Sequence, residues 1–170
     1  MAETSNQTKD FEYRVAAEND EAGIWQVFVE VAPNIPASVE KSEDQENLKA
    51  FISEWVAGGS TWVAVDSEDV VVGFVLSKPD NGIMALEKKN ALYLPYIGTS
   101  ANWQGRGVMK SLLDSLKSKR WPLTADVKHT NKSNMVENLE KVGFVKQSKN
   151  STKTRLRWNP PNAAQAHTKA

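Results

Sequence analysis

Residues 91–116 constrain the fold more than any other stretch of the sequence. Residues 91–99 (ALYLPYIGT) resemble a strand but contain Pro95 and Gly98. Proline cannot donate a ladder hydrogen bond, and a glycine inside a strand often marks a bulge, so we expect this strand to be broken locally. A glycine-rich turn follows at residues 105–107. An amphipathic helix then begins, and its apolar face holds Val108, Met109, Leu112, Leu113 and Leu116.

The rest of the chain alternates between helical and strand-like periods. Helical spacing recurs at residues 24–31, 43–57 and 135–142, and strand-like alternation at 11–17, 61–65, 70–76, 123–129, 144–147 and 152–158. Helices interleaved with a mostly antiparallel run of strands predict one α+β domain. We expect this domain to span residues 12–158, with flexible tails at residues 1–11 and 159–170.

Composition narrows the classes of function. The 170 residues include no cysteine, which excludes a disulfide framework, a thiolate nucleophile and zinc-finger spacing. The first residues are polar and acidic and lack the apolar core of a secretory signal. No apolar run approaches the roughly 18 residues that a membrane span requires. We therefore expect a cytoplasmic protein with no membrane partner and no metal.

The net charge of zero conceals a division along the chain. Residues 1–70 carry 4 basic and 15 acidic residues, a net of −11, whereas residues 71–170 carry 17 basic and 6 acidic residues, a net of +11. This asymmetry suggests that the second half faces an anionic ligand or partner. Two solvated faces of opposite sign are the simpler alternative, and charge alone does not decide between them.

The turn before the helix has the features of an anion site. Gly105 and Gly107 let the backbone approach a ligand closely and adopt conformations that other residues avoid. The first N–H groups of the helix point at that ligand, and Arg106 and Lys110 add positive charge. The stretch lacks the three glycines of a dinucleotide fingerprint and the Gly-Lys-Ser/Thr of a P-loop. A tight turn that needs glycine only for steric reasons is the alternative.

Two motifs resemble those of the GNAT acetyltransferase superfamily. Residues 104–109 (QGRGVM) fit four positions of its cofactor motif, Gln/Arg-x-x-Gly-x-Gly/Ala, and Met109 departs from the small final residue. Residues 139–144 (LEKVGF) are similar to its second signature, Tyr-Glu-Lys-x-Gly-Phe, with Leu139 in the tyrosine position. The order of the expected elements is also similar to that fold. The resemblance implies a mixed, mostly antiparallel central sheet of about six to seven strands, flanked by about four helices.

The resemblance also implies that the protein binds acetyl-CoA. The pyrophosphate is expected to be held by the backbone N–H groups of Gln104, Gly105, Arg106, Gly107, Val108 and Met109, with Lys110 adding positive charge. The broken strand at Ile97, Gly98 and Thr99 would pair with the pantetheine, and an N–H group there would polarise the thioester carbonyl. Asn131 or Asn134 would hydrogen-bond the pantetheine arm. Family spacing places that asparagine at residue 132, so both candidates stay open.

The activity implied by the resemblance is transfer of an acetyl group from acetyl-CoA to a primary amine by direct attack. The family commonly protonates the leaving thiolate with a tyrosine, and Leu139 cannot do so. Tyr96 on the broken strand is a candidate for ordering a water or donating a proton. His129 is a candidate general base, because its ordinary pKa suits that task. A packing role for Tyr96 and a strand-end role for His129 are the alternatives.

Leu139 also motivates an alternative function, a non-catalytic acyl-CoA-binding or sensing domain.

The sequence defines the acceptor side of the site less well than the cofactor side. Asp126 and Lys128 alternate with apolar residues, which is typical of an exposed strand face. The acidic residues near the first two helices suggest a cationic acceptor, and they include Glu40, Glu43, Asp44 and Glu46.

The C-terminal segments are basic and aromatic. Their charged and aromatic residues are Lys146, Lys149, Lys153, Arg155, Arg157 and Trp158. A nucleic-acid surface is one interpretation, but we favour a solvated strand face. Edge strands at this end of the sheet also allow a homodimer.

Overall fold

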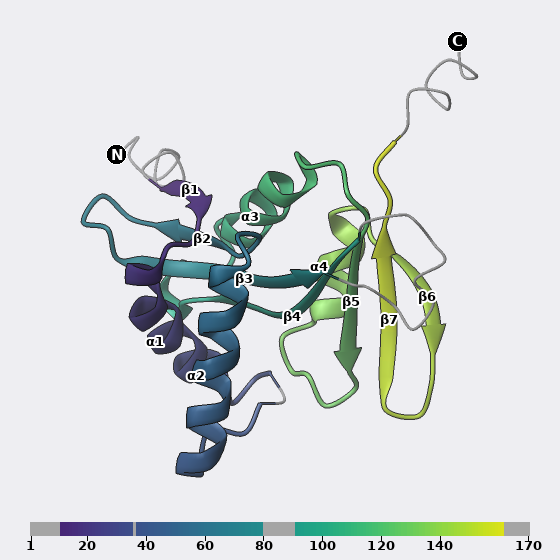
Figure 1. Cartoon of the computed structure of the whole chain (residues 1–170). Coiled ribbons are helices and arrows are strands. Elements are labelled where there is room, and N and C mark those ends of the chain that lie inside the picture. Colours follow the sequence, from purple (N-terminus) through teal and green to yellow (C-terminus); the bar gives the residue numbers. More distant parts are fainter. Residues whose placement is uncertain (1–10, 36, 80–90, 162–170) are drawn as a thin grey trace, which may run out of the picture.

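A single mixed sheet organises the molecule. The computed structural model of the chain describes residues 11–35, 37–79 and 91–161 (Figure 1). The strands are β1 (Glu12–Val15), β2 (Trp62–Val65), β3 (Val71–Pro79), β4 (Leu92–Thr99), β5 (Leu123–Lys128), β6 (Val145–Lys149) and β7 (Lys153–Trp158). Their order is β1-β2-β3-β4-β5-β7-β6, and only β4 and β5 pair in parallel. This mixed, mostly antiparallel sheet confirms the predicted fold class.

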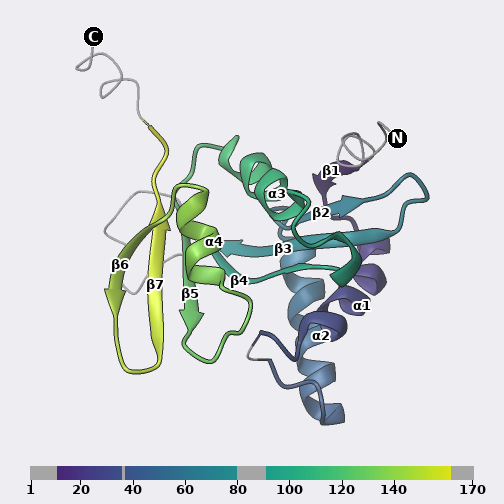
Figure 2. The same cartoon turned by 180° about the vertical axis from the view of Figure 1, so that it is seen from behind.

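Helices cover both faces of the sheet. In the described part of the chain they are α1 (Glu21–Val31), α2 (Ser42–Ala57), α3 (Val108–Lys117) and α4 (Met135–Lys141). Figure 1 shows α1 and α2 in front of the sheet, and Figure 2 shows α3 and α4 on the opposite face. Each pair of helices closes its own apolar core. Phe28 and Phe74 belong to the first core, and Leu112 and Leu139 to the second.

The parallel strands β4 and β5 are paired only where they begin. Their register contains two pairs, Leu92 with Leu123 and Tyr93 with Thr124. Beyond these pairs the two strands diverge (Figures 1 and 2). The edge of β4 after Tyr93 therefore has no strand partner on the side of β5. Backbone polar groups need hydrogen-bond partners, so this edge can receive an extended ligand.

Strand β4 contains the irregularity that Pro95 predicted. Leu76 of β3 pairs with Tyr96 of β4, and Lys78 pairs with Tyr93. One residue separates the pairing positions on β3 and two separate them on β4, so β4 contains one additional residue, a bulge. Gly98 does not belong to this bulge, because it pairs in register with Phe74. A Cβ at Gly98 would lie 2.8 Å from atoms of the Phe74 ring. Close packing, rather than a bulge, therefore explains this glycine.

The described residues extend slightly beyond the expected domain. Phe11 was expected in the N-terminal tail, but it is buried and its ring packs edge-on against Trp103, with the centroids 4.9 Å apart. At the other end, the carbonyl of Pro161 accepts a hydrogen bond from Arg120. The remainder of the two expected tails, residues 1–10 and 162–170, lies outside the described residues.

Candidate active site

The chain turns sharply between β4 and α3. A short 3-10 turn, η3 (Ala101–Trp103), leads to Gly105 and Gly107, whose φ angles of 76° and 82° lie in the left-handed region. Glycine adopts this region without steric cost. A Cβ at either position would meet no atom within 4 Å. The backbone conformation therefore requires these glycines, and the space in front of the loop stays open to a ligand.

Side chains from two directions hold this loop in place. The Nε2 of Gln104 donates a hydrogen bond to the carbonyl of Thr99 at 2.9 Å. Glu30 of α1 accepts a hydrogen bond from the N–H of Ala101 at 2.6 Å. These contacts fix the start and the middle of the connection, so the loop is preorganised before any ligand arrives.

Helix α3 begins directly after Gly107. Its first backbone bond runs from the N–H of Ser111 to the carbonyl of Gly107 at 3.0 Å. The N–H groups of Val108, Met109 and Lys110 therefore belong to the first turn and have no acceptor within the helix. The positive end of the helix dipole lies behind them. A helix start that is open in this way is suited to bind phosphate.

A cleft of about 600 Å³ lies in front of this loop and continues along β4. Nine of the twelve predicted cofactor residues line it, namely Ile97, Gly98, Thr99, Gln104, Gly105, Gly107, Val108, Met109 and Lys110. The segment before α4 and α4 itself provide the facing wall, with Lys132 and Asn138 among its residues. The cleft therefore joins the glycine-rich loop and the open edge of β4 in one elongated site.

The other three predicted cofactor residues do not line this cleft. The guanidinium of Arg106 lies over the ring of Trp103, 5.2 Å from its centroid. Asn131 uses its Oδ1 to accept a hydrogen bond from the N–H of Ser133 at 2.8 Å, and it faces a second cavity. Asn134 occupies the N-cap position of α4 with a φ of 55°, makes no side-chain capping hydrogen bond, and lines neither space.

Asn138 also lines the cleft, although it lies in neither sequence motif. Its Nδ2 donates to the carbonyl of Ser133 at 3.1 Å. Met135, Asn138 and Val142 all face the cleft, and they recur at helical spacing along α4 and the residue after it. That spacing was the available signal, but the motif at residues 139–144 does not show which face of the helix a ligand meets.

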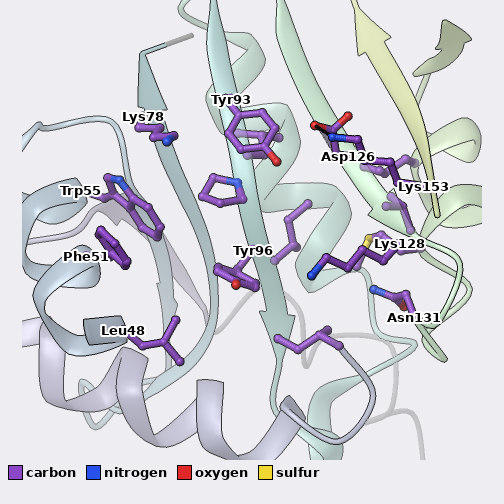
Figure 3. A pocket seen from close by; sticks show the side chains of 18 residues that line it. Leu48, Phe51, Trp55, Lys78, Tyr93, Tyr96, Asp126, Lys128, Asn131 and Lys153 are labelled. Carbon is purple, nitrogen blue, oxygen red and sulfur yellow. Dashed lines mark hydrogen bonds and ion pairs between the residues drawn. The ribbon is translucent and has the colours of Figure 1, made fainter. Parts of the chain in front are cut away.

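A second cavity, of about 380 Å³, lies between α2, β4 and β5 (Figure 3). Ile35, Ile97 and Met135 line both this cavity and the cleft, so the two spaces meet there. Phe51 and Trp55 of α2 form an aromatic wall, with their rings stacked at 5.5 Å between centroids. A group carried along the cleft can therefore meet a molecule held in the cavity near Ile97.

Two tyrosines of β4 face the cavity (Figure 3). The ring of Tyr96 packs edge-on against Phe28, with the centroids 5.0 Å apart. Burial raises the pKa of Tyr96 above its usual value. Burial, together with the charge of Asp126, raises the pKa of Tyr93 to about 12. Both phenols are therefore neutral at physiological pH, and each can donate a hydrogen bond or a proton.

Asp126 does not lie on an exposed strand face, contrary to the prediction from alternation. Its side chain is only 11% exposed, and its Oδ2 lies 3.3 Å from Nη1 of Arg155 and 3.5 Å from Nζ of Lys153. The alternation on β5 is present, but the cross-strand cations of β7 cover this side of the sheet. The result is a carboxylate in the cavity wall.

His129 is not brought together with Tyr96. It is exposed in the turn after β5 and lines neither the cleft nor the cavity. Its Nε2 lies 3.3 Å from Oγ1 of Thr154, and its N–H donates to the carbonyl of Thr152 at 2.8 Å. These contacts fit the strand-end role that was the alternative at this position.

The basic residues of the C-terminal hairpin are divided between two faces of the sheet. Lys146 lies opposite Leu156 and forms an ion pair with Glu140 of α4 at 3.8 Å. Arg155 lies opposite Asp126, on the side of the cavity. The hairpin therefore does not present its cations as one continuous nucleic-acid surface.

The described residues show neither a metal centre nor a spanning helix. Within residues 11–35, 37–79 and 91–161, no group of three or more His, Asp or Glu side chains is placed to hold a metal ion. No helix in the same ranges has the length and apolar character needed to cross a membrane.

Residues 25–144 match the acetyltransferase (GNAT) family, and the chain belongs to that family. No curated protein sequence matches the chain.

Solved structures share this fold. The structure of histone acetyltransferase HPA2 and related acetyltransferase from Corynebacterium glutamicum is 20% identical, with a TM-score of 0.64 over 90% of this chain and 98% of that chain. PaiA N-acetyltransferase from Thermoplasma acidophilum, solved with coenzyme A, is 16% identical, with a TM-score of 0.66 over 88% of this chain and 98% of that chain. Ard1 from Thermoplasma volcanium is 13% identical, with a TM-score of 0.64 over 90% and 99% of the two chains.

Proposed function

We propose that the protein transfers the acetyl group of acetyl-CoA to the primary amine of an acceptor, by direct attack of the amine on the thioester. One observation carries this proposal. The cleft that contains the open start of α3 meets the tyrosine-lined cavity at Ile97. Family membership supports acetyl transfer in general, and the two connected spaces give each substrate its own place.

The cleft provides suitable partners for acetyl-CoA. The pyrophosphate would lie before the first turn of α3 and accept hydrogen bonds from the N–H groups of Val108 and Met109. The pantetheine would follow the edge of β4 that β5 leaves after Tyr93. The acetyl group then reaches the junction near Ile97, where a backbone N–H of β4 can stabilise the oxyanion.

The chemistry requires two proton transfers around one substitution. The amine nitrogen forms a bond to the carbonyl carbon, and the carbon–sulfur bond then breaks. The amine loses a proton to water in the cavity, and the departing thiolate gains one. We assign this second proton to Tyr96, because its phenol faces the cavity and burial keeps it protonated. The proton that the amine gives to water then restores the phenol.

Leu139 is the basis of the competing hypothesis, a non-catalytic acyl-CoA-binding or sensing domain. This residue is fully buried and has no proton to donate. A chain that binds acyl-CoA without turnover would be a sensing domain rather than an enzyme. Tyr96 favours catalysis, because it supplies a phenol from β4 to the same cavity that Leu139 lines.

Two measurements test the proposal together. Calorimetric titration with coenzyme A should show binding, and release of free thiol from acetyl-CoA should depend on an added primary amine. Binding with no amine-dependent thiol release across a broad set of amines would favour the sensing domain. The absence of both binding and turnover would contradict the assignment of the cleft.

A further inference from the structure

The charges around the second cavity are unequal. Among the described residues that line it, Lys78, Lys128 and Lys153 are basic and Asp126 alone is acidic. The carboxylate of Asp126 is already matched, because Arg155 and Lys153 both lie within 3.5 Å of its Oδ2. The uncompensated charge of the cavity is therefore positive.

Two lysines provide this positive charge. Lys128 extends from the end of β5 into the cavity, and its Nζ points toward Tyr96 (Figure 3). Lys78 lies over the rings of Trp55 and Tyr93, with its Nζ 5.8 Å and 5.7 Å from their centroids. No carboxylate of the described residues forms an ion pair with either lysine.

The acidic residues that suggested a cationic acceptor do not reach this cavity. Glu43, Asp44 and Glu46 belong to α2 but are absent from its lining, where α2 contributes Leu48, Phe51 and Trp55. Helix α2 therefore turns an apolar and aromatic face to the cavity. The acidic half of the sequence gives the molecule its charge asymmetry, but it does not set the charge at the site.

We propose that the acceptor is an amine that also carries an anionic group, a carboxylate or a phosphate, which Lys128 and Lys78 bind. This inference rests on the proposed acetyl transfer. A cation attracts an anion bound close to it, and the attraction grows where water is excluded. The stacked rings of Phe51 and Trp55 would hold the apolar body between amine and anion. The cavity of about 380 Å³ suits a molecule of the size of an aromatic amino acid.

Matched acceptors test the inference. The first series is an aromatic amino acid, its amide and its decarboxylated amine, and the second is an aminoalkyl phosphate with the corresponding amino alcohol. Rates are compared per concentration of free base, because the amine pKa differs within each series. We expect kcat/KM to be at least about tenfold higher for the anionic member of a series. The series in which the difference is larger identifies the anion as carboxylate or phosphate.

Lysine variants locate the recognition. Lys128→Gln should lower kcat/KM about tenfold for the anionic acceptor and leave the neutral acceptor unchanged, whereas Lys128→Arg should retain the preference. Lys149→Gln removes the same charge from exposed β6, outside both spaces, and should change neither rate. If a neutral or cationic amine is preferred, or if Lys128→Gln affects all acceptors equally, the inference is overturned while acetyl transfer stands. If the chain binds coenzyme A but acetylates no amine, both proposals fail.

Discussion

Gly107 gives the cofactor cleft its most specific residue-level test. It has a φ of 82° and precedes the first turn of α3, so any side chain there stands where a phosphate would bind. Asparagine and aspartate tolerate this conformation better than other residues, and both are good helix N-caps. Gly107→Asp should therefore fold as well as Gly107→Asn but weaken coenzyme A binding at least about tenfold further, because the carboxylate repels the pyrophosphate. Calorimetric Kd values, with urea unfolding as the control for stability, make the comparison.

Equal Kd values for these two variants would contradict the placement of the phosphates. The two side chains have nearly the same shape, so a difference in affinity reports charge rather than steric blockage.

Tyr96 connects a shifted pKa to the rate of reaction. Burial raises its pKa above the usual value of 10, so the phenol keeps its proton through neutral and moderately alkaline pH. Tyr96→Phe should lower kcat about a hundredfold, the low end for a general acid, because a thiolate leaves readily. In the wild type, kcat should not decline through loss of this proton at any pH below about 10. The pH profiles of kcat for the two proteins check both statements.

The same variant controls for packing. Phenylalanine keeps the ring that lies edge-on against Phe28, so the urea midpoint of Tyr96→Phe should match that of the wild type. A kcat within twofold of the wild type would remove Tyr96 from the mechanism. An alkaline decline well below pH 10 that vanishes in the variant would show that the pKa is not raised.

At the scale of elements, an ion pair joins β1 to the start of α1. Arg14 on β1 contacts Asp20 through Nη1–Oδ2 at 2.5 Å and Nη2–Oδ1 at 3.0 Å. The Oδ2 of Asp20 also accepts the N–H of Ala17 at 2.8 Å. Burial alone would raise the pKa of Asp20, but these hydrogen bonds, above all the one from Arg14, outweigh it and lower the pKa.

This lowered pKa makes the stabilisation depend on pH. Since the folded-state pKa lies below the unfolded value of about 3.9, the carboxylate stabilises the fold above that value. The contribution is lost as the pH falls through the folded-state pKa. Asp20→Asn should therefore reduce the free energy of unfolding by about 1.5–3 kcal/mol at pH 7, and the difference should shrink as the pH falls below about 4. Urea titrations at pH 7 and pH 3 measure it.

Glu12→Gln is the matched control for this pair. Glu12 lies 4.0 Å from Nε of the same arginine, but its side chain is 63% exposed, so the change should have little effect at either pH. Equal losses for Asp20→Asn and Glu12→Gln, or a loss at Asp20 that does not depend on pH, would contradict the assigned role.

At this scale the sequence predicts well the features that depend on residues adjacent in the chain. The turn at Gly105 and Gly107 and the bulge near Pro95 follow from local backbone chemistry, and all three positions behave as expected. Gly98 does not, because its cause is the ring of Phe74 on another strand. Asp126 differs for a related reason. Alternation identifies the face of a strand, but the cover over that face comes from β7 and the cavity wall.

Across the whole molecule, most residues that line the cleft come from the basic half of the sequence. The start of α3, the facing α4 and the open edge of β4 all belong to residues 71–170, whose net charge is +11. Residues 1–70, which include β1, α1, α2 and β2, have a net charge of −11. In Figure 1 the earlier elements lie toward one end of the sheet and β5, β7 and β6 toward the other. The motifs at residues 104–109 and 139–144 predicted this site. The second cavity depends on α2, β4 and β5 meeting in space and has no motif of its own.

This charge distribution predicts how coenzyme A associates. A site on the positive side of a polar molecule should attract an anion over distances comparable to the Debye length, about 10 Å at 0.1 M salt. The association rate constant for coenzyme A should therefore fall about tenfold or more between low salt and 0.5 M salt, while the dissociation rate constant changes less. Dephospho-coenzyme A lacks one phosphate and should show a shallower dependence, which stopped-flow binding at several salt concentrations can resolve. An association rate that does not respond to salt, or the same slope for both ligands, would mean that the asymmetry of charge along the sequence has no part in capturing the cofactor.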